Sequence, residues 1–138
     1  MPYDPNNVFA KILRGELPCV KIYEDAQTLS FMDIAPSVEG HTLVIPKEAA
    51  ERVTELSPES AVALMRTTQK VATAVKKGLE CPALMLVELD GTDAGQSVPH
   101  VHFHILPRRA GLDLKFHGRA MVDPKTLEPI AAKIRAAL

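Results

Sequence analysis

The chain has 138 residues, which is typical of one domain, so residues 1–138 are predicted to fold as a single unit. Its formal net charge of −1 argues against a strongly basic face, and no nucleic acid partner is expected. No apolar run approaches the roughly 18 residues of a membrane span. The first residues also lack the pattern of a signal peptide, so no membrane association is expected. Cys19 and Cys81 form no CxxC pair, which favours free thiols in a reducing cytoplasm.

Apolar spacing and turn residues predict three helices and five strands. In chain order they are a helix over 8–14, strands over 21–24, 28–32 and 41–45, a helix over 58–79, strands over 83–87 and 101–106, and a helix that begins at 123–124. Strand 83–87 is almost continuously apolar, which predicts a central position in the sheet. In the long helix, apolar spacing places Leu64, Met65 and Val75 on one buried face. Short turns between strands favour an antiparallel five-stranded sheet with helices packed on it, an α+β domain.

Three of the five histidines, His100, His102 and His104, occupy alternate positions that begin one residue before the fifth expected strand and continue into it. They should share one face, because side chains alternate along a strand, while the apolar residues between them face the core. Three interpretations compete: a solvated polar face, a zinc site and a phosphate site. Other polar residues would serve a solvated face equally well. Against a zinc site, no acidic or cysteine residue lies nearby at a spacing typical of zinc ligands.

The loop at 90–97, which runs into the histidines, favours the phosphate interpretation. Gly91 and Gly95 permit unusual backbone dihedrals, and successive N–H groups in such a loop can form a nest for an anion. Gln96 and Ser97 add side-chain donors. A neutral imidazole beside such a loop can attack phosphorus near neutral pH, while its neighbours stabilise charge or carry a proton.

The segment HVHFHIL at 100–106 resembles the signature of the histidine triad (HIT) family. The preceding AGQSV at 94–98 is similar to the loop before that signature. Further resemblance covers FAKI at 9–12, GELP at 15–18, MDIAP at 32–36 and GHTLVIPK at 40–47. The resemblance implies a HIT-like fold, nucleotide hydrolase or transferase activity, and a homodimer in which two sheets join. Helix 58–79 and strand 83–89 are the expected dimer surfaces.

Site roles follow from the same resemblance, position by position. It implies that His102 is the nucleophile and forms a nucleotidyl-histidine intermediate, with His100 and His104 positioning it and binding phosphate. Ser97, with its neighbours, is expected to hold the α-phosphate and to help the leaving group depart. The expected substrate-binding residues are Phe9, Asp33, Ile34, His41, Gly95, Gln96 and Ser97.

Within this set, Asp33 would accept hydrogen bonds from the ribose hydroxyls, and Phe9 and Ile34 would line the base pocket. His41 is an accessory polar group. A turn role for Asp33 and a strand-start role for His41 remain open. The fifth histidine, His117, is interpreted as a surface residue.

Two positions depart from the family pattern. Asn7 and Ala10 stand where many bacterial members carry zinc-binding cysteines, and residues 48–50 supply no histidine, so no metal and no other cofactor is expected. Leu89 stands where an Asn or Gln often contacts the substrate, and substrate preference or rate could differ if its side chain faces the site.

Several functions remain open at this stage. The favoured one is a hydrolase acting at the α-phosphate of a purine nucleotide of the phosphoramidate or adenylate type. A dinucleoside polyphosphate hydrolase is the alternative, with Arg108 and Arg109 available to meet extra phosphates. A non-catalytic nucleotide-binding protein and a zinc hydrolase are further alternatives. The sequence names neither the leaving group nor the cellular pathway.

Overall fold

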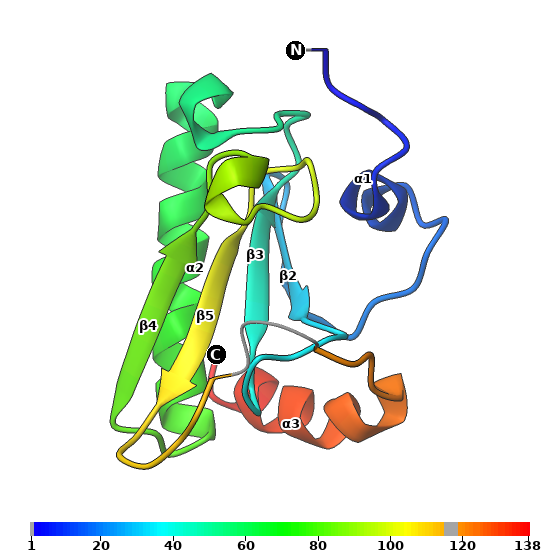
Figure 1. Cartoon of the computed structure of the whole chain (residues 1–138). Coiled ribbons are helices and arrows are strands. Elements are labelled where there is room, and N and C mark those ends of the chain that lie inside the picture. Colours follow the sequence, from blue (N-terminus) through cyan, green and yellow to red (C-terminus); the bar gives the residue numbers. More distant parts are fainter. Residues whose placement is uncertain (1, 115–118) are drawn as a thin grey trace.

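A computed structural model describes residues 2–114 and 119–138, and His117 lies outside these ranges. Its strands form one antiparallel sheet in the order β1-β2-β3-β5-β4 (Figure 1). The expected α+β fold with five antiparallel strands is confirmed. The elements are α1 (Val8–Leu13), β1 (Lys21–Glu24), β2 (Thr28–Met32), β3 (Thr42–Pro46), a 3-10 turn (Val53–Glu55), α2 (Pro58–Gly78), β4 (Ala83–Glu88), a 3-10 turn (Thr92–Ala94), β5 (Phe103–Arg108) and α3 (Pro124–Ala136).

Polar caps begin each of the three α-helices. The side chains of Asn7, Ser57 and Asp123 accept backbone N–H groups from the first turns of α1, α2 and α3. A proline occupies the first turn of both α2 and α3, where its missing N–H costs nothing. These local signals are why the helix boundaries agree with the sequence prediction to within about one residue.

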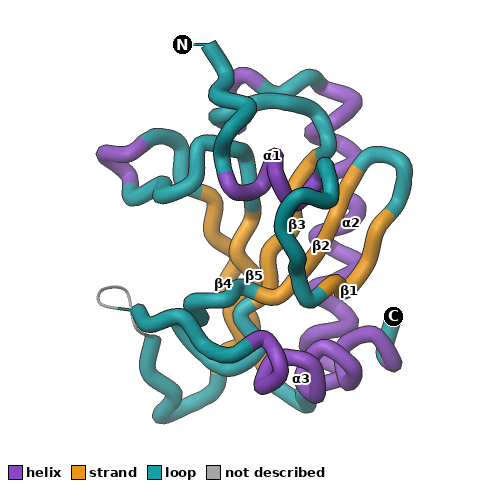
Figure 2. The backbone as a smooth tube through the Cα atoms, turned by 90° about the vertical axis from the view of Figure 1, so that its right-hand side faces the viewer, coloured by secondary structure: helices purple, strands orange, loops and turns teal. Residues whose placement is uncertain are grey.

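Helices cover both faces of the sheet. Helices α2 and α3 pack together against one face, and α1 lies across the other face, in front of β2 and β3 in Figure 2. The larger core, which includes Val44, Val101 and Ile105, lies under α2 and α3. A smaller core around Phe9 and Phe31 lies under α1. Consecutive side chains of β3 therefore pack alternately into the smaller and the larger core, because side chains of a strand alternate between its two faces.

Two details of the sequence prediction are wrong. Strand β4 lies at the edge of the sheet and pairs with β5 alone, so Met85 and Leu86 are 39% and 46% exposed. A continuous apolar pattern cannot distinguish a central strand from an edge strand with exposed apolar residues. Met65 of α2 also faces outward, with 48% of its surface exposed. Within the described residues, no helix has both the length and the apolar character needed to cross a membrane.

Candidate active site

A cavity of about 530 Å³ opens beside α1, a volume typical of small-molecule sites. Its wall comes from α1 and the segment after it, the end of β2, the start of β3, the start of β5 with the loop before it, and the start of α3 with the segment that leads into it. Of the expected site residues, six line it: Phe9, Asp33, Ile34, Ser97, His102 and His104. Four do not: His41, Gly95, Gln96 and His100.

His102 presents one free nitrogen. Its Nδ1 lies 2.6 Å from the carbonyl oxygen of His100, and a carbonyl can only accept, so Nδ1 carries the proton. Nε2 of the neutral ring is left with its lone pair. The rings of Phe9 and His104 contact His102 edge-on, with centroids 4.9 and 4.8 Å away. Burial lowers the pKa of His102 from 6.5 to about 4, so the ring is neutral near pH 7.

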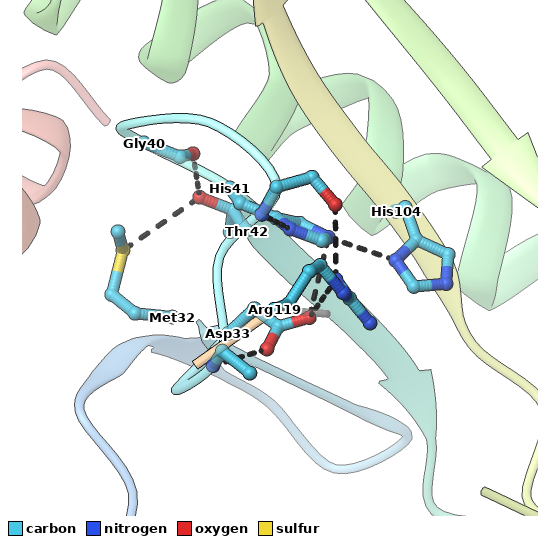
Figure 3. Close-up of polar contacts among 9 residues, drawn as sticks. Met32, Asp33, Gly40, His41, Thr42, His104 and Arg119 are labelled. Atoms are coloured by element: carbon cyan, nitrogen blue, oxygen red, sulfur yellow. Dashed lines mark hydrogen bonds and ion pairs between the residues drawn. The ribbon is translucent and has the colours of Figure 1, made fainter. Parts of the chain in front are cut away.

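His104 is oriented by His41, which sequence reasoning had treated as accessory (Figure 3). Nδ1 of His41 accepts the backbone N–H of Ser37 at 3.0 Å, so the neutral His41 ring carries its proton on Nε2. Nε2 lies 2.8 Å from Nδ1 of His104 and donates to it. His104 therefore carries its own proton on Nε2, which makes that atom a hydrogen-bond donor.

Strand geometry explains why these groups meet. His104 pairs with Leu43 in the sheet, and Leu43 packs in the core under α1, so His104 lies on the α1 face. His41 is two residues before Leu43 and shares that face. Asp33 follows β2 directly, and its N–H donates to the carbonyl of His41 at 3.0 Å.

Burial keeps the imidazoles neutral. It is the main cause that lowers the pKa of both His41 and His104 to about 3, and the positive charge of Arg119 acts in the same direction. Oδ2 of Asp33 lies 3.3 Å from Nε2 of His41, and because the ring is neutral this contact is not an ion pair. Burial raises the pKa of Asp33 above its usual value, opposed by the N–H of Ala35 and by Arg119.

The loop before β5 differs from the expected anion nest. The N–H groups of residues 94–96 all donate to carbonyl oxygens of Gly91 or Thr92. The Gln96 side chain is likewise committed, since it accepts the N–H of Gly91 at 2.7 Å and donates to the carbonyls of Glu51 and Val98. The Gln96 side chain and the Gly95 N–H are thus used within the loop. The expected contact of these two residues with phosphate stays a prediction.

Donors remain at the next two positions. Among the described residues, the N–H groups of Ser97 and Val98 have no internal acceptor, and both residues line the cavity. Leu89 does not line it. The Cδ1 atom of Leu89 lies 3.6 Å from where a Cβ at Gly95 would stand, so this side chain lies beside the loop at Gly95.

The hydrogen-bond roles do not fit a metal centre. Asp33, His41 and His104 place possible ligand atoms within 4.8 Å of one another. A neutral His41 that bound a metal through Nε2 would need its proton on Nδ1, but Nδ1 faces the N–H of Ser37. His100 is also unsuitable, because both of its nitrogens already bond to Tyr3 and Pro46. The three triad histidines therefore cannot chelate one ion in this arrangement.

Sequence reasoning missed one charged residue of the cavity wall. Arg119 lines the cavity, donates from Nη1 to Oγ of Ser37 at 3.0 Å and lies 3.6 Å from Oδ2 of Asp33 (Figure 3). No motif marks it. By contrast, Arg108 and Arg109 do not line this cavity, and Arg109 instead lies near the end of α2, where it contacts the carbonyl of Leu79.

Comparison with known proteins identifies the family. The HIT domain matches residues 14–111, which is most of the chain. The chain belongs to the HIT family. A crystal structure of a HIT-like protein from Bartonella henselae is 39% identical to this HIT protein, covers all of both chains and superposes with a TM-score of 0.95.

Two relatives with named activities also match. Adenosine 5'-monophosphoramidase hnt1 of Schizosaccharomyces pombe is 46% identical over 101 residues, which is 73% of each chain. Adenylylsulfatase HINT3 of Arabidopsis thaliana is 37% identical over 102 residues, which is 74% of this chain and 52% of the relative. Both names describe hydrolysis of a nucleotide.

Proposed function

We propose that this HIT protein is a hydrolase that cleaves the bond between the α-phosphate of a purine nucleotide and its leaving group. The orientation of His102 carries the proposal: Nδ1–H bonds to the His100 carbonyl, and the Nε2 lone pair remains for a substrate in the cavity. A neutral imidazole held in this way is a competent nucleophile. The names of the yeast and plant relatives support the same class of reaction.

The proposed reaction has two displacement steps. Nε2 of His102 attacks phosphorus, the bond from phosphorus to the leaving nitrogen breaks, and the departing amine takes up a proton from solvent water, which the second step returns. The imidazolium that forms is stabilised because its Nδ1–H donates to the His100 carbonyl. Water then attacks phosphorus and gives up a proton, the His102–phosphorus bond breaks, and the nucleoside monophosphate and neutral His102 are released.

The other residues divide into phosphate and nucleoside contacts. His104 offers Nε2–H to a phosphate oxygen, and Ser97 adds its hydroxyl and N–H at the cavity wall. Asp33 accepts the ribose hydroxyls, while Phe9 and Ile34 contact the base. His100 lies outside the cavity wall, so it positions His102 and does not bind phosphate.

The cavity favours a short substrate of the phosphoramidate or adenylate type. Extra phosphates of a dinucleoside polyphosphate would need several cations, because each carries negative charge. Among the described residues that line the cavity, Arg119 is the one Arg or Lys, and Arg108 and Arg109 lie elsewhere. The dinucleoside polyphosphate alternative therefore loses the residues that had supported it.

A single-turnover assay tests this function. Adenosine 5'-phosphoramidate and a diadenosine polyphosphate, each labelled at the α-phosphate, are mixed with excess wild-type protein or His102→Ala, and acid-labile label on the protein is measured. We expect faster cleavage of the phosphoramidate, with transient label on the wild type alone. Equal cleavage by His102→Ala would refute the nucleophile. Tight AMP binding without cleavage of either substrate would favour the non-catalytic alternative.

The second part of the proposal is a homodimer. The edge strand β4 leaves one row of backbone N–H and C=O groups unpaired, and long exposed edges of this kind invite pairing. Exposed apolar side chains cluster in the same elements, with Met85 and Leu86 on β4 and Val62 and Met65 on α2. Pairing of β4 with a second copy would extend the antiparallel sheet and cover these residues.

Light scattering at low micromolar concentration tests the dimer. We expect the wild type to have twice the chain mass and Leu86→Lys to be monomeric, because a buried lysine at the interface is costly. Leu138→Lys is the matched control, since Leu138 is similarly exposed but lies outside α2 and β4. A monomeric wild type would refute the proposal.

A further inference from the structure

His100 is held at both ring nitrogens. It is fully buried, and its Nε2 lies 2.8 Å from the carbonyl oxygen of Pro46. That oxygen can only accept, so Nε2 carries the proton. Burial lowers the pKa of His100, so the ring is neutral and its Nδ1 keeps a lone pair. A buried lone pair of this kind needs a donor.

Tyr3 supplies that donor from outside the matched HIT domain. Its hydroxyl oxygen lies 2.6 Å from Nδ1 of His100, and because Nδ1 has no proton, the hydroxyl must donate. The Tyr3 ring also meets the His100 ring edge-on, with centroids 5.7 Å apart. The domain match begins at residue 14, so this contact comes from a flanking segment.

Asn7 determines the direction of the Tyr3 hydroxyl. The Nδ2 group of Asn7 donates to Tyr3 Oη at 2.9 Å and to the carbonyl of Asp4 at 2.8 Å, and its Oδ1 accepts the N–H of Ala10 as the cap of α1. All three hydrogen bonds require the same assignment of the Asn7 amide, with Nδ2 facing Tyr3 and Asp4 and Oδ1 facing Ala10. Because Tyr3 Oη already accepts from Asn7, its own proton is free to point at His100.

The same residue connects to the proposed nucleophile. The carbonyl of His100 accepts Nδ1–H of His102, and this bond assigns the lone pair of His102 to Nε2. A shift of the His100 peptide would therefore change which nitrogen of His102 carries the proton and the direction in which Nε2 points. Tyr3 does not line the cavity, so it cannot touch a substrate there, and its direct link to His102 runs through His100.

We propose that Tyr3 is a positioning residue for the triad. Its hydroxyl, oriented by Asn7, holds His100 as the Nε2–H tautomer, and the His100 carbonyl in turn holds His102 with Nε2 free. The tautomer part of this inference is independent of turnover, whereas the effect on rate rests on the proposed function.

The test uses Tyr3→Phe, which keeps the ring contact and removes only the hydroxyl. Tyr23→Phe is the matched control, because the other tyrosine of the chain donates to Asp25 at 3.0 Å and does not line the cavity. Asn7→Asp is the second variant: the carboxylate still caps α1 but cannot donate to Tyr3. Any purification tag follows Leu138 so that the N-terminal segment stays unaltered.

Histidine 15N NMR provides the readout that does not depend on turnover. In the wild type we expect His100 to show a protonated Nε2 and an unprotonated, hydrogen-bonded Nδ1 near neutral pH. Tyr3→Phe should change the Nδ1 signal, because its donor is lost, and Asn7→Asp should change it in the same direction. Tyr23→Phe should leave it as in the wild type. An unchanged Nδ1 signal in Tyr3→Phe would overturn the inference, even if the protein proved to have no hydrolase activity.

Kinetics test the connection to His102. Tyr3→Phe should lower the single-turnover rate about fivefold, in the range of one lost hydrogen bond, and leave the Kd for AMP within about twofold. A purely structural defect would instead weaken AMP binding or lower the amount of folded protein. An unchanged rate in Tyr3→Phe, in the presence of wild-type turnover, would overturn the connection.

Discussion

The neutral buried histidines make the fold sensitive to acid. An unfolded histidine with a pKa of about 6.5 takes up a proton between pH 7.5 and pH 5, whereas folded His41, His102 and His104, with pKa values of about 3, 4 and 3, do not. The unfolded state therefore binds more protons, and stability falls as the pH falls. Each ring costs about 2 kcal/mol at pH 5, so the three together cost about 6 kcal/mol.

That loss is comparable to the whole stability of a small domain, roughly 5–15 kcal/mol. Urea unfolding at about pH 7.5 and about pH 5 measures it, and this range avoids most carboxylates with lowered pKa values, such as Glu24 and Glu48, which lose their contribution at lower pH. Asp33, whose pKa is raised, offsets a small part. The variant His41→Asn should reduce the pH dependence by about 2 kcal/mol. A change below about 1 kcal/mol in the wild type would refute the assignment of neutral rings.

Three further predictions concern the site. Between about pH 7.5 and the onset of acid unfolding, kcat/KM should show no acidic limb from His102, because the pKa of this ring is about 4 and it needs no deprotonation in that range. A limb at about pH 6.5, the ordinary pKa of histidine, would contradict the lowered pKa. Steady-state kinetics should show that His41→Leu lowers kcat about tenfold or more, while His41→Gln, which retains an N–H donor, is closer to wild type; equal losses would argue against the donor role. Calorimetry should show that Arg119→Gln weakens AMP binding about tenfold, with Arg119→Lys less affected, and unchanged affinity would remove Arg119 from the site.

The element order and the core were predictable because the signals are local. The cap residues Asn7, Ser57 and Asp123 mark the starts of the three α-helices. Alternation along residues 101–105 predicts that Val101 and Ile105 face the core, as they do. The position of β4 was not predictable, since an apolar run looks the same at the centre of a sheet and at an edge with exposed apolar side chains. An exposed surface that binds another chain can have the same apolar composition as a core, so composition alone does not distinguish the two.

The roles of the site residues were likewise not predictable from the sequence alone. The alternation of the histidines predicted a site but gave no basis for distinguishing their roles, because the role of each ring depends on which group each of its nitrogens contacts. His41 is more than 60 residues from its partner His104, and the two meet only because β3 and β5 are neighbours. Arg119 has no recognisable spacing from any motif. The hydrogen bonds of Gln96 within its own loop were not predictable, because the sequence does not show which buried backbone groups need a side-chain partner.

Three chemically identical side chains thus acquire three different tasks from their surroundings. His100 uses both nitrogens for hydrogen bonds within the protein, His102 uses one and presents a lone pair, and His104 accepts from His41 and presents a proton. The His100 and His104 arrangements need groups that the triad motif does not contain, namely the Tyr3 hydroxyl and the His41 ring. Tyr3 lies before the matched domain and Arg119 lies after it, so the segments that flank the triad also contribute to its surroundings in this chain.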